Sequence, residues 1–263
     1  MKISVLGATG AMGGFVIKAA LQEGYAVINK VASRDDISSL FTNTEVVIDF
    51  SCPMATESML RYAINNRSSV PLIIGTTGLS KMHINLMHEC ASTTPVFYSP
   101  NMSFVISIAN MMIYALSKLL GENFDVEILD VHHKLKKDAP SGTALMFGKT
   151  VARARKREFD DVANFVRYGI VEPRERGEIG FSVQRCGNVI GTHEISFFGE
   201  YENIKIQHEA HSKEIFAKGA VKAARWILNQ AKGFYTMNDF TKDMIVPIVK
   251  DIYKDFFSKQ SSN

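Results

Sequence analysis

Residues 2–14 read KISVLGATGAMGG, an apolar run followed at once by closely spaced glycines. The run Lys2–Leu6 is compatible with a β-strand, and residues 15–22 continue with helical character as far as Gly24. The glycines between them are Gly7, Gly10 and Gly13. A strand, a glycine turn and a helix in this order are typical of Rossmann-like, dinucleotide-binding domains.

The next eighty residues alternate between strand and helix patterns. Strands are expected at residues 26–31, 46–50, 71–74 and 96–98, and helices at 54–65 and 80–91. This alternation predicts right-handed crossovers and a parallel sheet that is covered on both faces. The first two strands are interpreted as apolar runs that are buried on both faces.

The pattern changes after Pro100. A helix over residues 105–120 is followed by a strand at 125–131, and further strands are expected at 179–185, 193–198 and 202–209. Successive strands without helices between them predict a second α+β domain with an antiparallel or mixed sheet. The helix at 215–228 is expected to return to the first domain. The domains predicted are 1–103 rejoined by 213–245, then 104–212, with 246–263 as a peripheral tail.

Composition narrows the class of protein. The chain has 263 residues, 46% of them hydrophobic, and a net charge of +3, which predicts a globular protein that needs neither nucleic acid nor membrane. Three cysteines without regular spacing, Cys52, Cys90 and Cys186, favour a reducing compartment. The N-terminus shows no signal-peptide pattern, and residues 104–120 are interpreted as a buried helix, so a cytoplasmic location is expected.

The glycine turn has the spacing G-x-x-G-x-x-G, not the strict G-x-G-x-x-G. Its glycines would let the backbone approach a pyrophosphate at the helix start, although a turn without a ligand is the alternative. The end of the second strand, Ser33-Arg34, suits a 2′-phosphate and so favours NADPH. Asp35 and Asp36 follow directly, so NADH remains open, and an arginine exposed in a loop is the simpler interpretation.

The second informative stretch is residues 127–144, which read EILDVHHKLKKDAPSGTA. His132 and His133 can share a pocket if the strand ends there, and Lys136 adds a positive charge and a proton donor. The helix start at Ser141-Gly142-Thr143 offers amides and hydroxyls to a carboxylate. The alternative is a solvated basic loop before a capped helix. No ligand set with metal spacing is visible, so no metal is expected.

Residues 127–144 resemble the signature of the 4-hydroxy-tetrahydrodipicolinate reductase family at every fixed position but one. Asp130 stands where the family has glutamate. Further landmarks follow in the family's order, at residues 47–51, 75–78 and 99–103. Ala11 and Lys213 replace arginines that are common in the family, and Met102 replaces an aromatic residue.

The resemblance implies a reductase that delivers hydride from NADPH or NADH to a small dicarboxylate in lysine biosynthesis, and a homotetramer. It implies that His132 and Lys136 are the acid–base pair. It implies that His133, Ser141, Gly142 and Thr143 bind the substrate. The residues implied to contact the cofactor are Gly7, Ala8, Thr9, Gly10, Ala11, Met12, Arg34, Gly75, Thr76, Thr77, Ser99, Pro100, Asn101 and Met102. Two alternatives remain: an aspartate- or homoserine-type dehydrogenase, and a regulator that binds NADPH without turnover.

Overall fold

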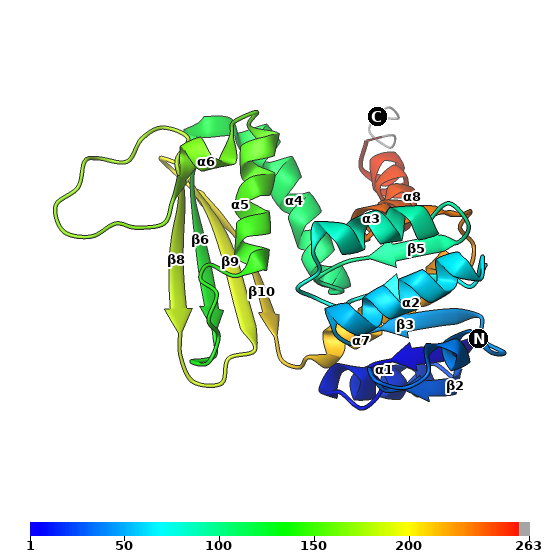
Figure 1. Ribbon diagram of the computed structural model, residues 1–263. Helices are drawn as coiled ribbons and strands as arrows, with labels where there is room; N and C mark the ends of the chain where they lie inside the picture. Colours follow the sequence, from blue (N-terminus) through cyan, green and yellow to red (C-terminus); the bar gives the residue numbers. More distant parts are fainter. Residues whose placement is uncertain (258–263) are drawn as a thin grey trace. The chain divides into compact units, whose positions relative to one another are not determined.

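The computed structural model describes residues 1–257 and divides into two compact units (Figure 1). Unit 1 comprises Met1–Phe104 and the chain from Lys213 onward, and unit 2 comprises Val105–Ser212. Residues 258–263, the end of the expected tail, lie outside the described residues.

Unit 1 is built on a six-stranded parallel sheet with the order β11-β5-β4-β3-β1-β2. Its strands are β1 (Lys2–Leu6), β2 (Ala26–Val31), β3 (Val46–Asp49), β4 (Leu72–Ile74), β5 (Pro95–Tyr98) and β11 (Gly233–Thr236). Its helices are α1 (Ala11–Gln22), the 3-10 turn η1 (Ile37–Phe41), α2 (Pro53–Asn65), α3 (Lys81–Cys90), α7 (Glu214–Ile227) and α8 (Met237–Phe257). The Rossmann-like half is thus confirmed.

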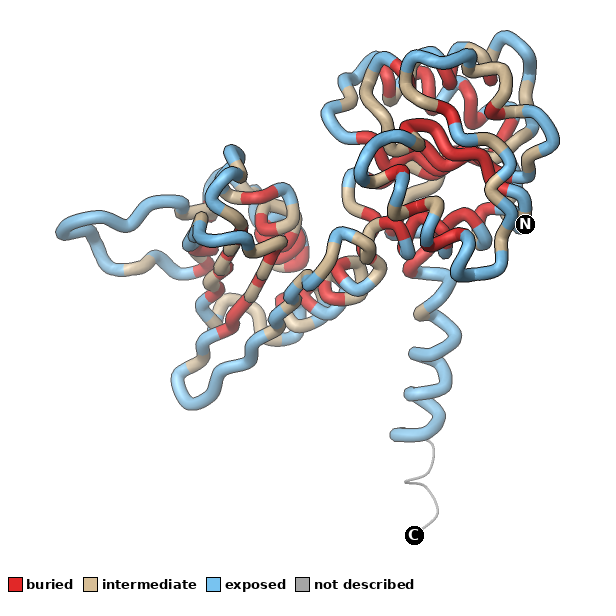
Figure 2. Tube along the Cα trace, turned by 90° about the horizontal axis from the view of Figure 1, so that it is seen from below, coloured by how far each residue is buried: buried red, intermediate tan, exposed pale blue. Residues whose placement is uncertain are grey.

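Helices cover both faces of this sheet. One apolar cluster joins α1, α7 and the start of α8 to the sheet, and a second joins α2 and α3 to the other face. The helix expected at 215–228 is α7, which packs against α1, and Lys18 of α1 forms an ion pair with Glu214 at 2.6 Å. The buried strands form the centre of unit 1 (Figure 2).

Two details of unit 1 differ from the sequence prediction. β2 is not buried on both faces: it is the edge strand, and its side chains alternate between exposed and half-buried positions as far as Val31. An edge strand has one neighbour and less cover, which suits the polar pair Asn29-Lys30. The short strand β11 was not predicted, because its four residues depend on pairing with β5 rather than on an apolar pattern.

The tail is helical but does not begin at residue 246. α8 runs without interruption from Met237 to Phe257, with Pro247 inside it. Phe240 and Thr241 are buried, whereas residues 246–256 are exposed (Figure 2). The expected boundary therefore falls inside one helix, whose first turns belong to the core of unit 1.

Unit 2 is built on a five-stranded mixed sheet with the order β10-β9-β6-β8-β7. Its elements are α4 (Phe104–Leu120), η2 (Gly121–Asn123), β6 (Asp125–His132), α5 (Gly142–Ala154), α6 (Phe159–Val162), β7 (Ala163–Asn164), β8 (Ile179–Arg185), β9 (Gly191–Phe198) and β10 (Asn203–Ala210). β6 pairs antiparallel with β9 and parallel with β8, as the prediction of a mixed sheet allows. Helices α4 and α5 share one apolar cluster with this sheet.

Helix α4 is less buried than the sequence suggested. Together with η2 it forms the segment Phe104–Asn123, which is long and apolar enough to cross a membrane by length and composition alone. In the structure a single stripe, Ile106, Ala109, Ile113 and Ser117, is buried. These positions recur at helical spacing, so α4 packs with one face and is not a fully buried helix.

Candidate active site

The glycine turn of unit 1 forms a tight connection between β1 and α1. A Cβ at Gly13 would lie 2.2 Å from the carbonyl oxygen of Gly7, so a larger residue would open the turn. Helix α1 begins after Gly10, which supplies no side-chain cap, and its first turn holds no acidic residue. The helix start therefore presents backbone N–H groups without a competing carboxylate, which fits a pyrophosphate.

A cavity of about 310 Å³ lies in unit 1. Among the residues predicted to contact the cofactor, its lining includes Met12, Gly75, Thr76, Thr77, Pro100, Asn101 and Met102. It also includes four residues that were not predicted to contact the cofactor: Phe50, Ser51, Lys213 and Phe216. A Cβ at Gly75 would lie 2.4 Å from the Phe50 ring, so this glycine leaves room for the ring that lines the cavity.

A buried carboxylate holds the loops beside this cavity. Asp49, at the end of β3, accepts hydrogen bonds from the backbone N–H of Ser51 at 3.0 Å and from the hydroxyl groups of Ser51 and Thr56 at 2.5 Å each. The Ser51 N–H also donates to the hydroxyl of Thr76 at 3.0 Å. Burial raises the pKa of Asp49, against the opposing effect of these hydrogen bonds. Asp49 thereby ties the loop after β3 to the loop after β4.

Arg34 lies in the loop after β2 and is exposed. The neighbouring aspartates are occupied locally: Asp35 accepts from the N–H of Ala32 at 2.8 Å, and Asp36 accepts from the N–H of Ser38 at 3.0 Å. Within residues 1–257 no hydrogen bond or ion pair is found for the Arg34 guanidinium. This side chain can therefore reach an anionic group.

In unit 2, the second motif lies on a strand whose buried face changes from apolar to polar. The buried positions of β6 are Val126, Ile128, Asp130 and His132. The register places His193 of β9 directly opposite Asp130, and Arg185 of β8 beside His132. Because paired residues project to the same face of a sheet, these polar side chains meet at one end of the apolar core.

Asp130 is the centre of this polar cluster. Its Oδ2 accepts hydrogen bonds from the N–H of Ser141 at 2.7 Å and from Nη2 of Arg185 at 3.0 Å. Its Oδ1 lies 2.9 Å from Nδ1 of His132 and 3.4 Å from Nε2 of His193. The His132 contact is not an aligned hydrogen bond, because neither atom has a partner with hydrogen-bond geometry, and it becomes an ion pair only when His132 is protonated.

Lys136 lies in the loop between β6 and α5, where its ammonium forms an ion pair with Asp138 at 2.8 Å. Arg185 fixes the same loop by donating to the carbonyl oxygen of Asp138 at 2.7 Å. His133 follows the end of β6 and is half-buried, so the strand does end between the two histidines.

Helix α5 starts as the sequence predicted, with Ser141 as its N-cap. The Ser141 hydroxyl accepts from the N–H of Ala144 at 3.3 Å and lies 3.0 Å from Nε2 of His193. The Ser141 N–H is already used by Asp130. Gly142 and Thr143 follow as the first residues of the helix, and Ser141 shapes the turn before them.

The side chains of Asp130, His132 and His193 could also hold a metal ion, because their ligand atoms lie within 4.8 Å of one another. Sequence spacing gave no sign of this group, since it assembles across two strands. Arg185 already neutralises the Asp130 carboxylate at 3.0 Å. A cation beside the carboxylate disfavours a divalent ion, so these donors fit proton handling better.

Burial changes the ionisation of these histidines. It lowers the pKa of His132, against the opposing attraction of Asp130, and it lowers the pKa of His193 to about 4. The pKa of Asp130 is also lowered: burial would raise it, but the hydrogen bonds from Ser141 and Arg185 outweigh burial. At neutral pH the cluster therefore contains an ionised carboxylate and a neutral His193.

The low pKa of His193 predicts acid sensitivity. In the unfolded chain a histidine titrates near about 6.5, so between that pH and about 4 the unfolded state binds more protons. The stabilising contribution of a neutral His193 is therefore fully present above about pH 6.5 and is lost as the pH falls toward about 4. We expect the titration of His193 to lower the free energy of unfolding by about 2 kcal/mol at pH 5 relative to pH 7.5. Urea unfolding of wild type and His193→Phe at both pH values measures this, and equal pH slopes would contradict it.

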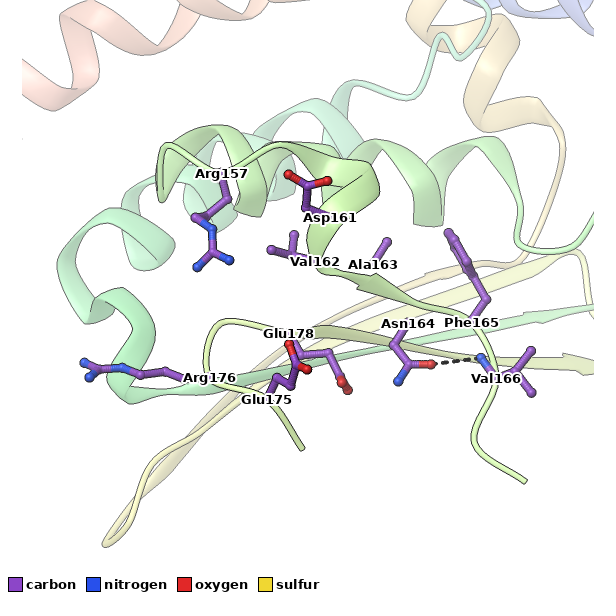
Figure 3. Close-up of a pocket in the computed structure, with 10 residues that line it drawn as sticks. All are labelled: Arg157, Asp161, Val162, Ala163, Asn164, Phe165, Val166, Glu175, Arg176 and Glu178. Carbon is purple, nitrogen blue, oxygen red and sulfur yellow. Dashed lines mark hydrogen bonds between the residues drawn. The ribbon is translucent and has the colours of Figure 1, made fainter. Parts of the chain in front are cut away.

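A second cavity of about 360 Å³ lies elsewhere in unit 2 and shares no residue with the polar cluster (Figure 3). Asp161 and Val162 line it from α6, and Glu178 from the approach to β8. Two of its charged residues form ion pairs within the chain: Arg157 contacts Glu122 at 2.8 Å, and Glu178 contacts Arg167. Arg167, in the loop before β8, also contacts Glu127 of β6 at 2.9 Å and so joins that loop to the sheet.

The structure adds Arg185 and His193 to the candidate functional residues, and sequence reasoning missed both. Each is at an inward position of its strand, where the apolar alternation gives way to a polar residue. In β9 the inward residues Ile195 and Phe197 lead to His193, as Val126 and Ile128 lead to Asp130 in β6. A polar residue at the inward position that follows inward apolar residues of a strand could have marked these two residues in the sequence.

Comparison with known proteins agrees with this arrangement. Two family models match: "Dihydrodipicolinate reductase, N-terminus" over residues 1–102 and "Dihydrodipicolinate reductase, C-terminus" over residues 105–241. A 4-hydroxy-tetrahydrodipicolinate reductase of Geotalea uraniireducens is 36% identical, covering 91% of this chain and 98% of that protein. One of Zymomonas mobilis is 38% identical, covering 91% and 96%.

Among solved structures, the dipicolinate-bound dihydrodipicolinate reductase from Paenisporosarcina sp. TG-14 has the same fold. Its TM-score is 0.67 at 19% identity, covering 90% of this chain and 97% of that chain. A probable dehydrogenase from Thermotoga maritima has a TM-score of 0.55 at 9% identity, covering 97% of each chain.

Together, the fold and the family models define an oxidoreductase with a Rossmann-like nucleotide-binding unit and a second unit built on a mixed sheet, for which a nicotinamide dinucleotide is the implied hydride donor. The chain belongs to the 4-hydroxy-tetrahydrodipicolinate reductase family, also called dihydrodipicolinate reductase. Its activity is the reduction of 4-hydroxy-tetrahydrodipicolinate in the diaminopimelate route to lysine. The aspartate- or homoserine-type dehydrogenase and the regulator without turnover are thereby set aside.

Proposed function

We propose that His132 and Lys136 are the acid–base pair of this reductase. The observation that carries the proposal is the buried Asp130 carboxylate, held by Arg185 and Ser141, at 2.9 Å from His132 Nδ1. A carboxylate at Nδ1 orients the ring and stabilises its protonated form, so Nε2 can give and regain a proton. Lys136 adds a second proton donor and positive charge beside the reacting atoms.

The substrate is a small dicarboxylate, and we assign its binding to His133 and to the helix start at Ser141, Gly142 and Thr143. The N-terminal amides of α5 and the dipole of the helix favour a carboxylate. His133 and Lys136 supply hydrogen-bond donors and positive charge. The relative from Paenisporosarcina binds dipicolinate, a ring with two carboxylates, which supports a substrate of this class.

The cofactor residues follow from the turn and the cavity of unit 1. The backbone from Gly7 to Met12 is assigned to the pyrophosphate, and Gly75–Thr77 with Ser99–Met102 to the nicotinamide half. NAD(P)H, when bound, supplies the hydride. The protein holds the loops rigid through Asp49 and excludes water with Met12, Phe50 and Met102, which line the cavity.

NADPH is the preferred cofactor in this proposal, because Arg34 is exposed and unpaired whereas Asp35 and Asp36 are locally engaged. Arg34→Ala should raise the KM for NADPH by about 10–100-fold, the usual effect of losing hydrogen bonds to a charged group. The KM for NADH should change less than about threefold, which makes NADH the internal control. Steady-state kinetics with both cofactors measures this, and equal changes in the two KM values would overturn the preference.

We also infer a cytoplasmic homotetramer, the assembly that the family resemblance implies. Apolar side chains on unit 2 support association, since Met112, Leu119 and Tyr168 are exposed in the single chain. Light scattering coupled to gel filtration tests the assembly, and a monomer at micromolar concentration would contradict it.

The acid–base proposal is tested with His132→Asn, which keeps a polar group but removes the titratable proton. The expected result is a fall in kcat of about 10²–10⁴-fold with little change in dinucleotide binding. A variant with wild-type kcat would exclude His132 from the proton transfer.

A further inference from the structure

We propose that His193 is a positioning residue, which holds the Asp130 carboxylate against His132 and connects both to the start of α5. The proposal rests on the acid–base function assigned to His132, and it concerns how that ring is kept in place.

The sheet register puts His193 where it can act in this way. Asp130 and His193 are direct partners in the antiparallel pair of β6 and β9, and His132 projects from the same face two residues further along. Gly191, two residues before His193, leaves the space that the His132 ring uses. A Cβ at Gly191 would lie only 3.0 Å from His132 Nε2. The segment Gly191–His193 therefore shapes one wall around the His132 ring.

The contacts of Asp130 divide between its two oxygens. Oδ2 is held by the Ser141 N–H and the Arg185 guanidinium, which fix the carboxylate at one side. Oδ1 faces both histidines, 2.9 Å from His132 Nδ1 and 3.4 Å from His193 Nε2. Rotation of the carboxylate away from His132 would therefore have to move Oδ1 past the His193 ring.

His193 has a second contact that anchors it. Its Nε2 also lies 3.0 Å from the hydroxyl of Ser141, the N-cap of α5. Because burial keeps His193 neutral, we assign the ring proton to Nε2, where the Ser141 hydroxyl can accept it and Asp130 Oδ1 lies 3.4 Å away. A neutral His193 does not compete for the Asp130 charge, which remains available to a protonated His132. The charged and titratable groups that face His193 are Asp130, His132, Lys136 and His208.

Loss of His193 should therefore affect the chemistry more than substrate binding. Without the Nε2 donor, Asp130 keeps its contacts through Oδ2, but Oδ1 and the His132 ring can turn away from their present contact. The substrate carboxylate meets the amides of α5, which His193 does not use. The expected pattern is a lower kcat with a nearly unchanged affinity for a dicarboxylate.

The test compares His193→Phe, His193→Gln and, as a matched control, His208→Phe. His208 of β10 is the direct cross-strand partner of His193, and the centroids of the two rings lie 6.4 Å apart. We expect His193→Phe to lower kcat by about 10–100-fold, less than the loss of the acid itself. Glutamine, which restores an N–H donor, should recover most of this loss. His208→Phe should retain kcat, and all three should bind dipicolinate within about threefold of wild type.

A crystal structure of His193→Phe separates this proposal from the proposed function, since it needs no activity. His132 displaced from Asp130, together with a lower kcat, supports the positioning role. A second outcome is that His132 is displaced in the His193→Phe structure while the His132→Asn variant keeps its activity. This outcome would support the positioning role of His193 but refute the acid–base assignment of His132. Wild-type kcat in His193→Phe with His132 unmoved would overturn the positioning role, as would a glutamine variant as impaired as the phenylalanine variant.

Discussion

Replacement of Lys136 by alanine is expected to lower kcat by about 10²–10⁴-fold, the usual cost of losing a general acid. The side chain lies in the loop between β6, which carries His132, and α5, and it forms an ion pair with Asp138. Its loss removes a proton donor and a positive charge from the site, whereas the buried contacts of Asp130 do not include it. Steady-state assays of the variant measure the effect.

The control for this variant is Lys137→Ala, since Lys137 is the adjacent lysine and is exposed. It changes the net charge by the same amount and should keep kcat within about twofold. If both lysine variants lost activity equally, the effect would belong to the charge of the loop and not to Lys136.

Replacement of Asp130 by asparagine is expected to have the largest effect on stability. Asp130 is fully buried, and its carboxylate balances the Arg185 guanidinium, which lies 3.0 Å away and is itself mostly buried. Removing one partner of a buried ion pair leaves the other charge uncompensated, at a cost of about 3–5 kcal/mol. Urea unfolding at neutral pH, followed by circular dichroism, measures the change in the free energy of unfolding.

Asp138→Asn is the matched control, because it also neutralises a paired aspartate, but one that is largely exposed. An exposed ion pair contributes about 0–1 kcal/mol, so this variant should remain close to wild type. Asp130→Glu introduces the residue typical of the family and keeps the negative charge, so this variant should lose less stability than Asp130→Asn. A loss below about 1 kcal/mol in Asp130→Asn would show that Arg185 does not depend on this carboxylate.

The parallel sheet of unit 1 could be predicted because its strands are short apolar runs separated by helices. β3 and β4 illustrate this, since every residue of both strands is buried. β11 could not be predicted in the same way, because it depends on β5 for its hydrogen bonds and not on its own pattern.

The candidate site was only partly predictable, for a similar reason. His132, Lys136 and Ser141 are neighbours in the sequence, and a local motif brought them together. Arg185 and His193 reach the site through strand register, 55 and 63 residues beyond Asp130, and no local pattern encodes that register. The residue contacts that distinguish a proton-handling cluster from a basic loop therefore came from the structure alone.

Three residues that depart from the family pattern, Met102, Lys213 and Asp130, have defined surroundings in the structure. Met102 and Lys213 both line the cavity of unit 1, where the family more often has an aromatic residue and an arginine. Asp130, although shorter than glutamate, still reaches Ser141 and Arg185 with hydrogen bonds. The shorter side chain thus contacts both neighbouring segments.

The most direct test of the account is the oxidation of NADPH and NADH by the purified chain, with substrate made in the same vessel by enzymatic condensation of pyruvate with aspartate semialdehyde. We expect oxidation that depends on the condensing enzyme, with a higher kcat/KM for NADPH than for NADH. Oxidation that is no faster with the condensation product than without it would contradict the account.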